Sequence, residues 1–179
     1  MNREEFEHVI RAAAAIVKDD IVVIGSQAVL AQYPDAPAPL LRSSEVDVFP
    51  RSDPGRSDEI DGAIGDGSRF HESYGYYAHG VGPEAVIAPA GWQDRLVPVE
   101  VPATGHKDAT VTAWCLEVHE LVIAKLAANR PHDHEFVEEA IRSGLVDEGR
   151  LRRGVELLPT GDRERVRERL IGLISKVGR

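Results

Sequence analysis

Two carboxylates in the first third of the chain have the type and spacing needed to hold a divalent cation. Glu45 and Asp47 are separated by one residue, in a segment that alternates polar and apolar side chains as a strand does. Alternate residues of a strand point to the same face, so the two carboxylates are expected side by side. Such a pair offers hard oxygen ligands to one or two Mg²⁺ ions.

A Gly-Ser turn upstream of this pair has the composition of a phosphate-binding turn. Residues 21–24, all β-branched and apolar, predict a buried strand, and Gly25 and Ser26 end it. A turn that lacks a Cβ lets backbone N–H groups approach a phosphate closely. Phosphates beside Mg²⁺ are what nucleotidyl transfer needs, because the metal neutralises their charge while an acceptor hydroxyl attacks in line.

The elements that must position these residues are a mixture of strands and helices. Hydrophobic patterning predicts strands at residues 21–24, 45–49 and 95–101, with a β-hairpin or two short strands within 70–88. Helical spacing is found at residues 3–18, 27–32, 57–64, 116–129, 133–143, 150–157 and 162–177. We therefore predict an α/β (α+β) fold, with a core over 1–112 and a helical segment over 113–179 packed on it as one unit.

Length and composition are those of an ordinary globular chain. The 179 residues are 42% hydrophobic and 28% charged, and the single cysteine, Cys115, excludes an intrachain disulfide and a Cys-based zinc cluster. No apolar run approaches the roughly 18 residues that span a bilayer. The start of the chain is acidic and mixed, unlike a signal peptide, so we expect a cytoplasmic protein without membrane contact.

Charge is distributed unevenly along the chain. The net charge is −9, from 21 Lys and Arg against 30 Asp and Glu, and all of the acidic excess lies before residue 120. An acidic protein has no general attraction for nucleic acid. The Arg-rich stretches after residue 149 are interleaved with glutamates, which favours ion pairing along solvated helices.

The order of four segments resembles the nucleotidyltransferase superfamily. They are Val23-Ile24-Gly25-Ser26, Glu45-Val46-Asp47-Val48, Gly91-Trp92-Gln93-Asp94-Arg95-Leu96 and residues 121–133, LVIAKLAANRPHD. Over about residues 20–147 the chain is similar to small bacterial nucleotidyltransferase-like proteins related to AbiEii-type toxins of toxin–antitoxin systems. The resemblance implies a nucleotidyltransferase-type mixed β-sheet flanked by helices, Mg²⁺ and an NTP donor. In some toxin members it also implies a tRNA 3′ end as acceptor and an antitoxin protein as partner.

The resemblance also implies roles for individual residues. The triphosphate would lie against Gly25, Ser26 and Lys125, the metal against Glu45, Asp47 and Glu100, and the catalytic groups would be Asp47, Lys125 and Asp133. Three features depart from the superfamily pattern. The separation between Gly25-Ser26 and Glu45 is long and Pro-rich. The first acid of the pair is Glu where most members have Asp, and the third carboxylate is not obvious, Glu100 being the best candidate by position.

Each of these residues also has a purely structural interpretation. Gly25-Ser26 alone is a plain turn, and the carboxylate pair alone suits the solvent face of an edge strand. Lys125 lies among apolar residues and would then extend along a helix surface, while Asp133 fits a helix N-cap and Glu100 an outward-facing strand position.

The histidines and tyrosines of the segment 70–88 have two interpretations. Their rings either stack on a nucleotide base or pack on the sheet, and the residues concerned are His71, Tyr74, Tyr76, Tyr77 and His79.

Two functions follow from these alternatives. The first is an enzyme, a Mg²⁺-dependent nucleotidyltransferase that modifies an acceptor hydroxyl on a tRNA 3′ end or a protein. The second is a catalytically silent member of the fold that binds a nucleotide or a partner. Convergence of Glu45 and Asp47 with Glu100 or Asp133 within about 5 Å would favour the enzyme. Lys125 buried against Asp133, with Glu100 pointing away, would favour the binding protein.

Overall fold

The core of the molecule is a five-stranded mixed sheet. The computed structural model describes residues 1–104 and 109–178. The strands are β1 (Ile21–Val23), β2 (Glu45–Pro50), β3 (Tyr77–Gly80), β4 (Val97–Pro102) and β5 (Thr110–Cys115), in the order β3-β2-β1-β5-β4. β1 pairs with β5 and β2 with β3 in parallel, whereas β1–β2 and β4–β5 are antiparallel.

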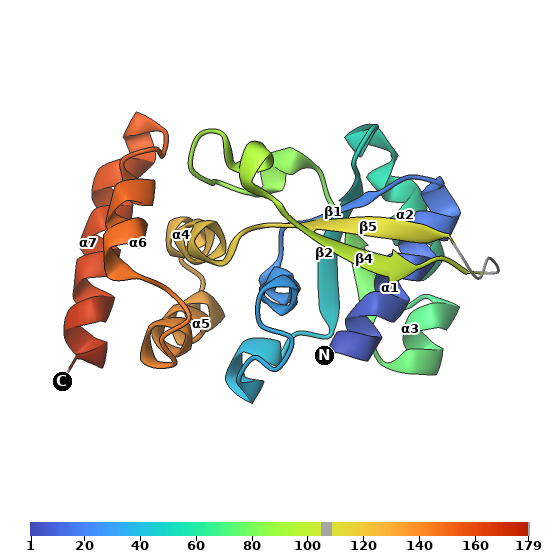
Figure 1. Ribbon diagram of the computed structural model, residues 1–179, viewed down its shortest axis with the longest axis horizontal. Helices are drawn as coiled ribbons and strands as arrows, with labels where there is room; N and C mark the ends of the chain where they lie inside the picture. The colour runs from blue at the N-terminus through green and yellow to red at the C-terminus, as the bar shows by residue number, and fades with distance from the viewer. Residues whose placement is uncertain (105–108, 179) are drawn as a thin grey trace.

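Helices flank this sheet in two groups, which confirms the predicted α/β class. The α-helices are α1 (Arg3–Val17), α2 (Ser57–Ile64), α3 (Arg69–Tyr74), α4 (Val118–Ala128), α5 (Pro131–Arg142), α6 (Glu148–Val155) and α7 (Thr160–Val177). The first three lie around the sheet, and the last four pack together at the other end of the molecule (Figure 1). None of the described helices is long and apolar enough to cross a membrane.

Helix α1 covers one face of the sheet. A capping box between Asn2 and Glu5 starts it, because each side chain accepts the other residue's backbone N–H. Its apolar side, which includes Phe6 and Ile10, is buried in the main core. The opposite face of the sheet is covered by a smaller cluster in which Trp92 packs on Ile24 and its neighbours. Both faces of β1 are thus covered by apolar side chains.

Helix α4 is buried on all sides except at its end. Its apolar residues are spread around the whole circumference, which is typical of a core helix, and His119, Glu120 and Lys125 lie among them. Glu117 caps its start by accepting the backbone N–H of His119, and Asn129 ends it in the left-handed region at φ 59°. Contacts with α5, α6 and α7 enclose it, so a charged side chain on α4 must find its partner within the protein.

The segment 70–88, which its aromatic residues predicted to be a β-hairpin or two short strands, contains most of helix α3 followed by the single strand β3. Ser68 caps α3 by accepting the backbone N–H of His71, and Gly75 closes it at φ 77°. Tyr74 and Phe70 pack on His8 of α1. The hairpin prediction was wrong because capping at both ends outweighed the strand preference of the rings.

The change from strands to helices comes later in the chain than residue 112. The β5 strand spans that position and pairs with β1 and β4, so the C-terminal group of helices begins only after Cys115. β5 lies between β1 and β4 in the sheet, and two residues separate its end from the start of α4.

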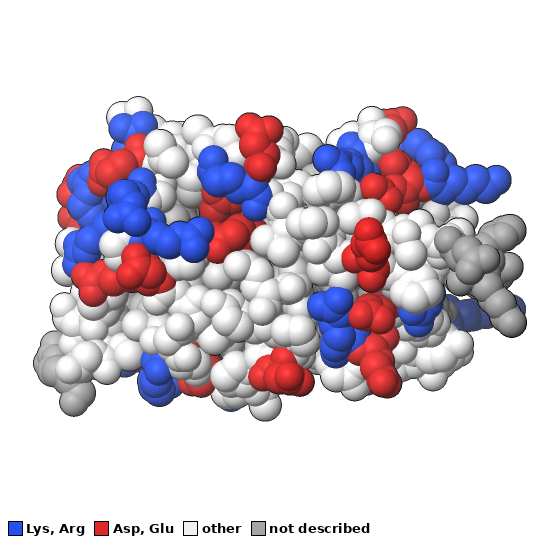
Figure 2. Space-filling model, in the orientation of Figure 1, with Lys and Arg blue, Asp and Glu red and all other residues white. Residues whose placement is uncertain are grey.

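The arginines of α6 and α7 lie among carboxylates (Figure 2). Arg152 pairs with Glu148, and Arg167 pairs with Glu156 and Glu164. The predicted pairing along solvated helices is therefore present.

Candidate functional site

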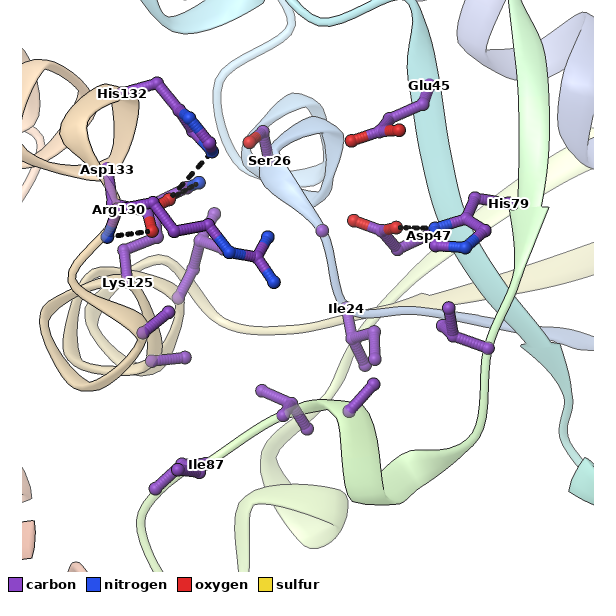
Figure 3. Close-up of a pocket in the computed structure, with 17 residues that line it drawn as sticks. Ile24, Ser26, Glu45, Asp47, His79, Ile87, Lys125, Arg130, His132 and Asp133 are labelled. Carbon is purple, nitrogen blue, oxygen red and sulfur yellow. Dashed lines mark hydrogen bonds and ion pairs between the residues drawn. The ribbon is translucent and has the colours of Figure 1, made fainter. Parts of the chain in front are cut away.

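A pocket of about 490 Å³ lies between the sheet and the helices α4 and α5. Six of the residues singled out in the sequence line it: Gly25, Ser26, Glu45, Asp47, Lys125 and Asp133. Glu45 and Asp47 point into it from one side, and the side chains of the α4–α5 region face them from the other (Figure 3). Its volume is within the range of small-molecule sites.

The two carboxylates are presented by the alternation of β2. Val46 and Val48 are completely buried in the core, whereas Glu45 and Asp47 are only half-buried and face the pocket. The i, i+2 spacing therefore places both carboxylates on one face, as the sequence predicted.

A third ligand type comes from β3. The parallel register pairs Asp47 with His79 and Glu45 with Tyr77, and His79 Nδ1 lies at hydrogen-bonding distance, 2.9 Å, from Asp47 Oδ1. The Tyr77 hydroxyl donates to Glu45 Oε2 at 3.0 Å. One ligand atom each from Glu45, Asp47 and His79 lie within 4.8 Å of one another. Two carboxylates and an imidazole are a donor set that fits a divalent cation.

Gly25 is required at this site by the position of Asp47. A Cβ built on Gly25 would lie 2.1 Å from Asp47 Oδ2, and the Ile24 N–H donates to the Asp47 carbonyl at 3.1 Å. The backbone of Gly25, at φ −86°, is one that any residue adopts. The glycine therefore serves to let the carboxylate approach the turn closely, and the sequence motif reflects this packing.

The electrostatics of this wall favour bound positive charge. Burial raises the pKa of Asp47, the hydrogen bond from His79 opposes that rise, and the charge of Glu45 adds to it. Burial and the hydrogen bond to Glu45 together raise the pKa of Tyr77 to about 12. A cation between the carboxylates would offset both desolvation and mutual repulsion.

The opposite wall contains a buried ion pair. Lys125 Nζ lies 2.9 Å from Asp133 Oδ1, and the two side chains are 10% and 4% exposed. The other carboxylate oxygen of Asp133 accepts the backbone N–H of Arg130 at 3.0 Å, which fixes the start of α5. Lys125 also lies over the ring of Phe136, 4.7 Å from its centre. Both members of the pair thus have partners within their own wall.

Arg130 and His132 are exposed side chains of this wall. Both line the pocket, and the guanidinium of Arg130 extends from the α4–α5 connection toward the centre of the pocket (Figure 3). It faces the side on which Asp47 lies. Lys125 is the cation that the sequence motif marked, but Arg130 is the one that reaches into the open space.

The family of this chain is shown by its match to a protein-family model. Residues 4–168 match the model of a family described as a nucleotidyltransferase of unknown function, DUF6036. The chain belongs to this family. It has no significant match among curated proteins or among solved structures. Membership in DUF6036 supports the predicted nucleotidyltransferase superfamily, and an NTP is the substrate that a nucleotidyltransferase implies.

In this DUF6036 chain Glu100 lies away from the pocket. It is exposed on β4 and pairs with Thr112 of β5, and the strands β1 and β5 separate β4 from β2. The structure therefore does not bring Glu100 to Glu45 and Asp47. His79 lies beside them instead.

The sequence allowed two interpretations of His79, stacking on a nucleotide base or packing on the sheet. The alternation of Tyr77, Ala78 and His79, with Ala78 buried, is the one local signal of its orientation. The pairing of β3 with β2 is not visible in the sequence.

Proposed function

We propose that this protein transfers a nucleotide from an NTP to an acceptor hydroxyl with a divalent cation held at Glu45 and Asp47. The observation that carries the proposal is the pocket in which these carboxylates and His79 lie beside the Gly25 turn and opposite Arg130. The sequence predicts Mg²⁺ as the ion, and a bound divalent cation would neutralise phosphate charge during in-line attack.

The residues around the cation have separate roles in this proposal. Backbone N–H groups at the Gly25-Ser26 turn bind the triphosphate from the sheet side, and Arg130 binds it from the helix side. Lys125 adds positive charge to the same wall but donates its hydrogen bond to Asp133, so it acts mainly by holding the start of α5 in place.

The proton of the acceptor hydroxyl goes to Asp47 in this scheme. The sequence left Asp47 and Asp133 as alternatives for this role. One oxygen of Asp133 accepts from Lys125 and the other from the Arg130 backbone, at 2.9 and 3.0 Å. Asp47 has its Oδ2 beside Gly25 and faces the open pocket, which makes it the better-placed acceptor.

The acceptor and the partner follow from the resemblance to AbiEii-type proteins. We propose a tRNA 3′ end or a protein hydroxyl as acceptor and a toxin role restrained by an antitoxin protein. The end of an acceptor can bind at the mouth of the pocket, where Arg130 and His132 are exposed. Binding there does not need a separate basic surface on the protein.

A catalytically silent binding protein is the second candidate. The buried Lys125–Asp133 pair and the remote position of Glu100 are the features that favour it. Such a protein would keep the pocket to bind a nucleotide and would transfer nothing.

Incubation with α-³²P-labelled NTPs tests the two candidates. The purified protein, Mg²⁺ or Mn²⁺, each NTP, total tRNA and a protein extract are combined, with Asp47→Ala in parallel and Glu100→Ala as the matched carboxylate control. Label in RNA or protein that is lost in Asp47→Ala and kept in Glu100→Ala supports the transferase. If no label is transferred but calorimetry shows metal-dependent NTP binding, the binding protein is supported. If the protein neither transfers label nor binds an NTP, the proposal is overturned.

The role of Arg130 is tested by NTP binding alone. Arg130→Ala should weaken binding by about 10–100-fold, the worth of one or two charge-assisted hydrogen bonds, without lowering the melting temperature. Arg42→Ala removes an exposed arginine that is paired with Glu135 and serves as the control. Equal binding by Arg130→Ala and Arg42→Ala would contradict the assignment.

A further inference from the structure

We infer that the imidazole of His79 is the third protein ligand of the cation and that the site therefore selects Mn²⁺ over Mg²⁺. This inference rests on the proposed function, because it names the ion that the Glu45–Asp47 site holds. The sequence predicted a third carboxylate, Glu100, at this position. The structure offers a nitrogen ligand there instead.

The sheet itself brings His79 to the carboxylates. The parallel register sets Asp47 opposite His79, and alternation sends both side chains to the pocket face. The ligand atoms of Glu45, Asp47 and His79 lie within 4.8 Å of one another, close enough to converge on one ion. The side chain of His79 is 49% exposed and that of Asp47 is 27% exposed, so an ion has access from the pocket.

The surrounding contacts keep these ligands oriented. The Tyr77 hydroxyl donates to one oxygen of Glu45 and leaves the other for the ion. The close approach of Gly25 limits the positions open to Asp47 Oδ2. Partners of this kind fix metal ligands, and their loss commonly costs about 10–100-fold in metal affinity.

The donor set distinguishes Mn²⁺ from Mg²⁺. Mg²⁺ takes oxygen ligands almost exclusively and gives up its water reluctantly, whereas imidazole suits the transition metals. An imidazole ligand carries no negative charge. A site with imidazole in place of a third carboxylate therefore has a lower affinity for a hard ion such as Mg²⁺. Mn²⁺ accepts both carboxylate and imidazole and keeps open positions for phosphate oxygens, so it fits two carboxylates and one histidine at an open pocket.

A positioning role is the alternative for His79. Its Nδ1 lies 2.9 Å from Asp47 Oδ1, so the ring can also act by donating an N–H to that carboxylate from outside the coordination sphere. In that case the nitrogen does not touch the ion, and replacing the ring would weaken both ions alike.

Binding of the metal alone to the full chain separates these roles. Mn²⁺ and Mg²⁺ are titrated by calorimetry and by competition, and the Mn²⁺ complex is examined by pulsed electron paramagnetic resonance for coupling to ¹⁴N. The variants are His79→Asp, which restores a third carboxylate, Asp47→Asn, and His134→Ala as a histidine control hydrogen-bonded to Asn129 outside the metal cluster. Circular dichroism checks that each variant is folded.

The wild-type protein should bind Mn²⁺ at least about 10-fold more tightly than Mg²⁺, with a ¹⁴N coupling in the Mn²⁺ spectrum. His79→Asp should lose the coupling and bring the two affinities within a few-fold of each other, while His134→Ala should match the wild type. Mn²⁺ bound through Asp47 but without ¹⁴N coupling would overturn the inference and leave the proposed function standing. No binding of either ion, or binding unchanged in Asp47→Asn, would overturn both.

Discussion

Replacing Gly25 by alanine would place a carbon atom within the space of the Asp47 carboxylate. The added Cβ would lie 2.1 Å from Oδ2, 2.8 Å from Cγ and 2.9 Å from Cβ of Asp47. The backbone of Gly25, at φ −86° and ψ −172°, accommodates alanine without strain. The variant therefore crowds both the Asp47 carboxylate, which can turn away, and the Asp47 Cβ, which can move only if the turn and β2 separate slightly.

The size of the effect follows from these distances. Oδ2 must move by about 1.3 Å to reach ordinary contact at 3.4 Å, whereas metal–ligand distances hold within about 0.2 Å. We expect metal affinity to fall by about 10–100-fold or more. The carboxylate of Asp47, which is 27% exposed, can move into the pocket, but its Cβ is held by β2, so the free energy of unfolding should fall by about 1–3 kcal/mol. That corresponds to a melting temperature lower by about 2–12 °C.

Calorimetric titration with Mn²⁺ and thermal unfolding test this prediction together. Gly62→Ala is the matched control, because no atom lies within 4 Å of its Cβ and the residue is on the exposed side of α2. Unchanged metal affinity in Gly25→Ala would refute the reasoning that Asp47 holds the ion beside this turn. A loss of folding rather than of binding would assign Gly25 a structural role instead.

Three further predictions concern stability and reactivity. Lys125→Met should lower the free energy of unfolding in urea by about 3 kcal/mol because it leaves the buried Asp133 unpaired, and Lys125→Met/Asp133→Leu should recover much of that loss. Burial raises the pKa of Asp47, so its ionisation costs stability as pH rises above 3.8; with metal chelated, Asp47→Asn should therefore gain stability relative to wild type at pH 7 but not at pH 3. An equal difference at both pH values would contradict this. Burial raises the pKa of Cys115 to about 12, so thiol reagents should label it only after unfolding, and fast labelling of the native protein would disprove its burial.

Local patterns in the chain were enough to define one half of the site. Strand alternation alone put Glu45 and Asp47 on one face, and the apolar run before Gly25 gave β1 and the turn that ends it. Helical spacing gave α1 and the four C-terminal helices within a few residues of their observed bounds. These features depend on neighbours along the chain, whose geometry follows directly from the period of a strand or a helix.

The same local reasoning failed where the ends of an element outweighed its composition. The rings of Phe70 and Tyr74 predicted strand, but Ser68 and Gly75 cap a helix around them. No strand was predicted at residues 110–115, where β5 lies. Strand pairing is a contact between distant segments, so composition alone does not fix where a sheet ends.

The other half of the site depended on contacts between segments far apart in the sequence. His79 reaches Asp47 only because β3 pairs with β2 in a particular register, and Glu100 misses it because β1 and β5 lie between β4 and β2. Lys125 turned inward to Asp133 because surrounding helices bury α4 on all sides, and that left Arg130 to face the pocket. Register, strand order and helix packing are settled by burial of the whole core, which no local period encodes.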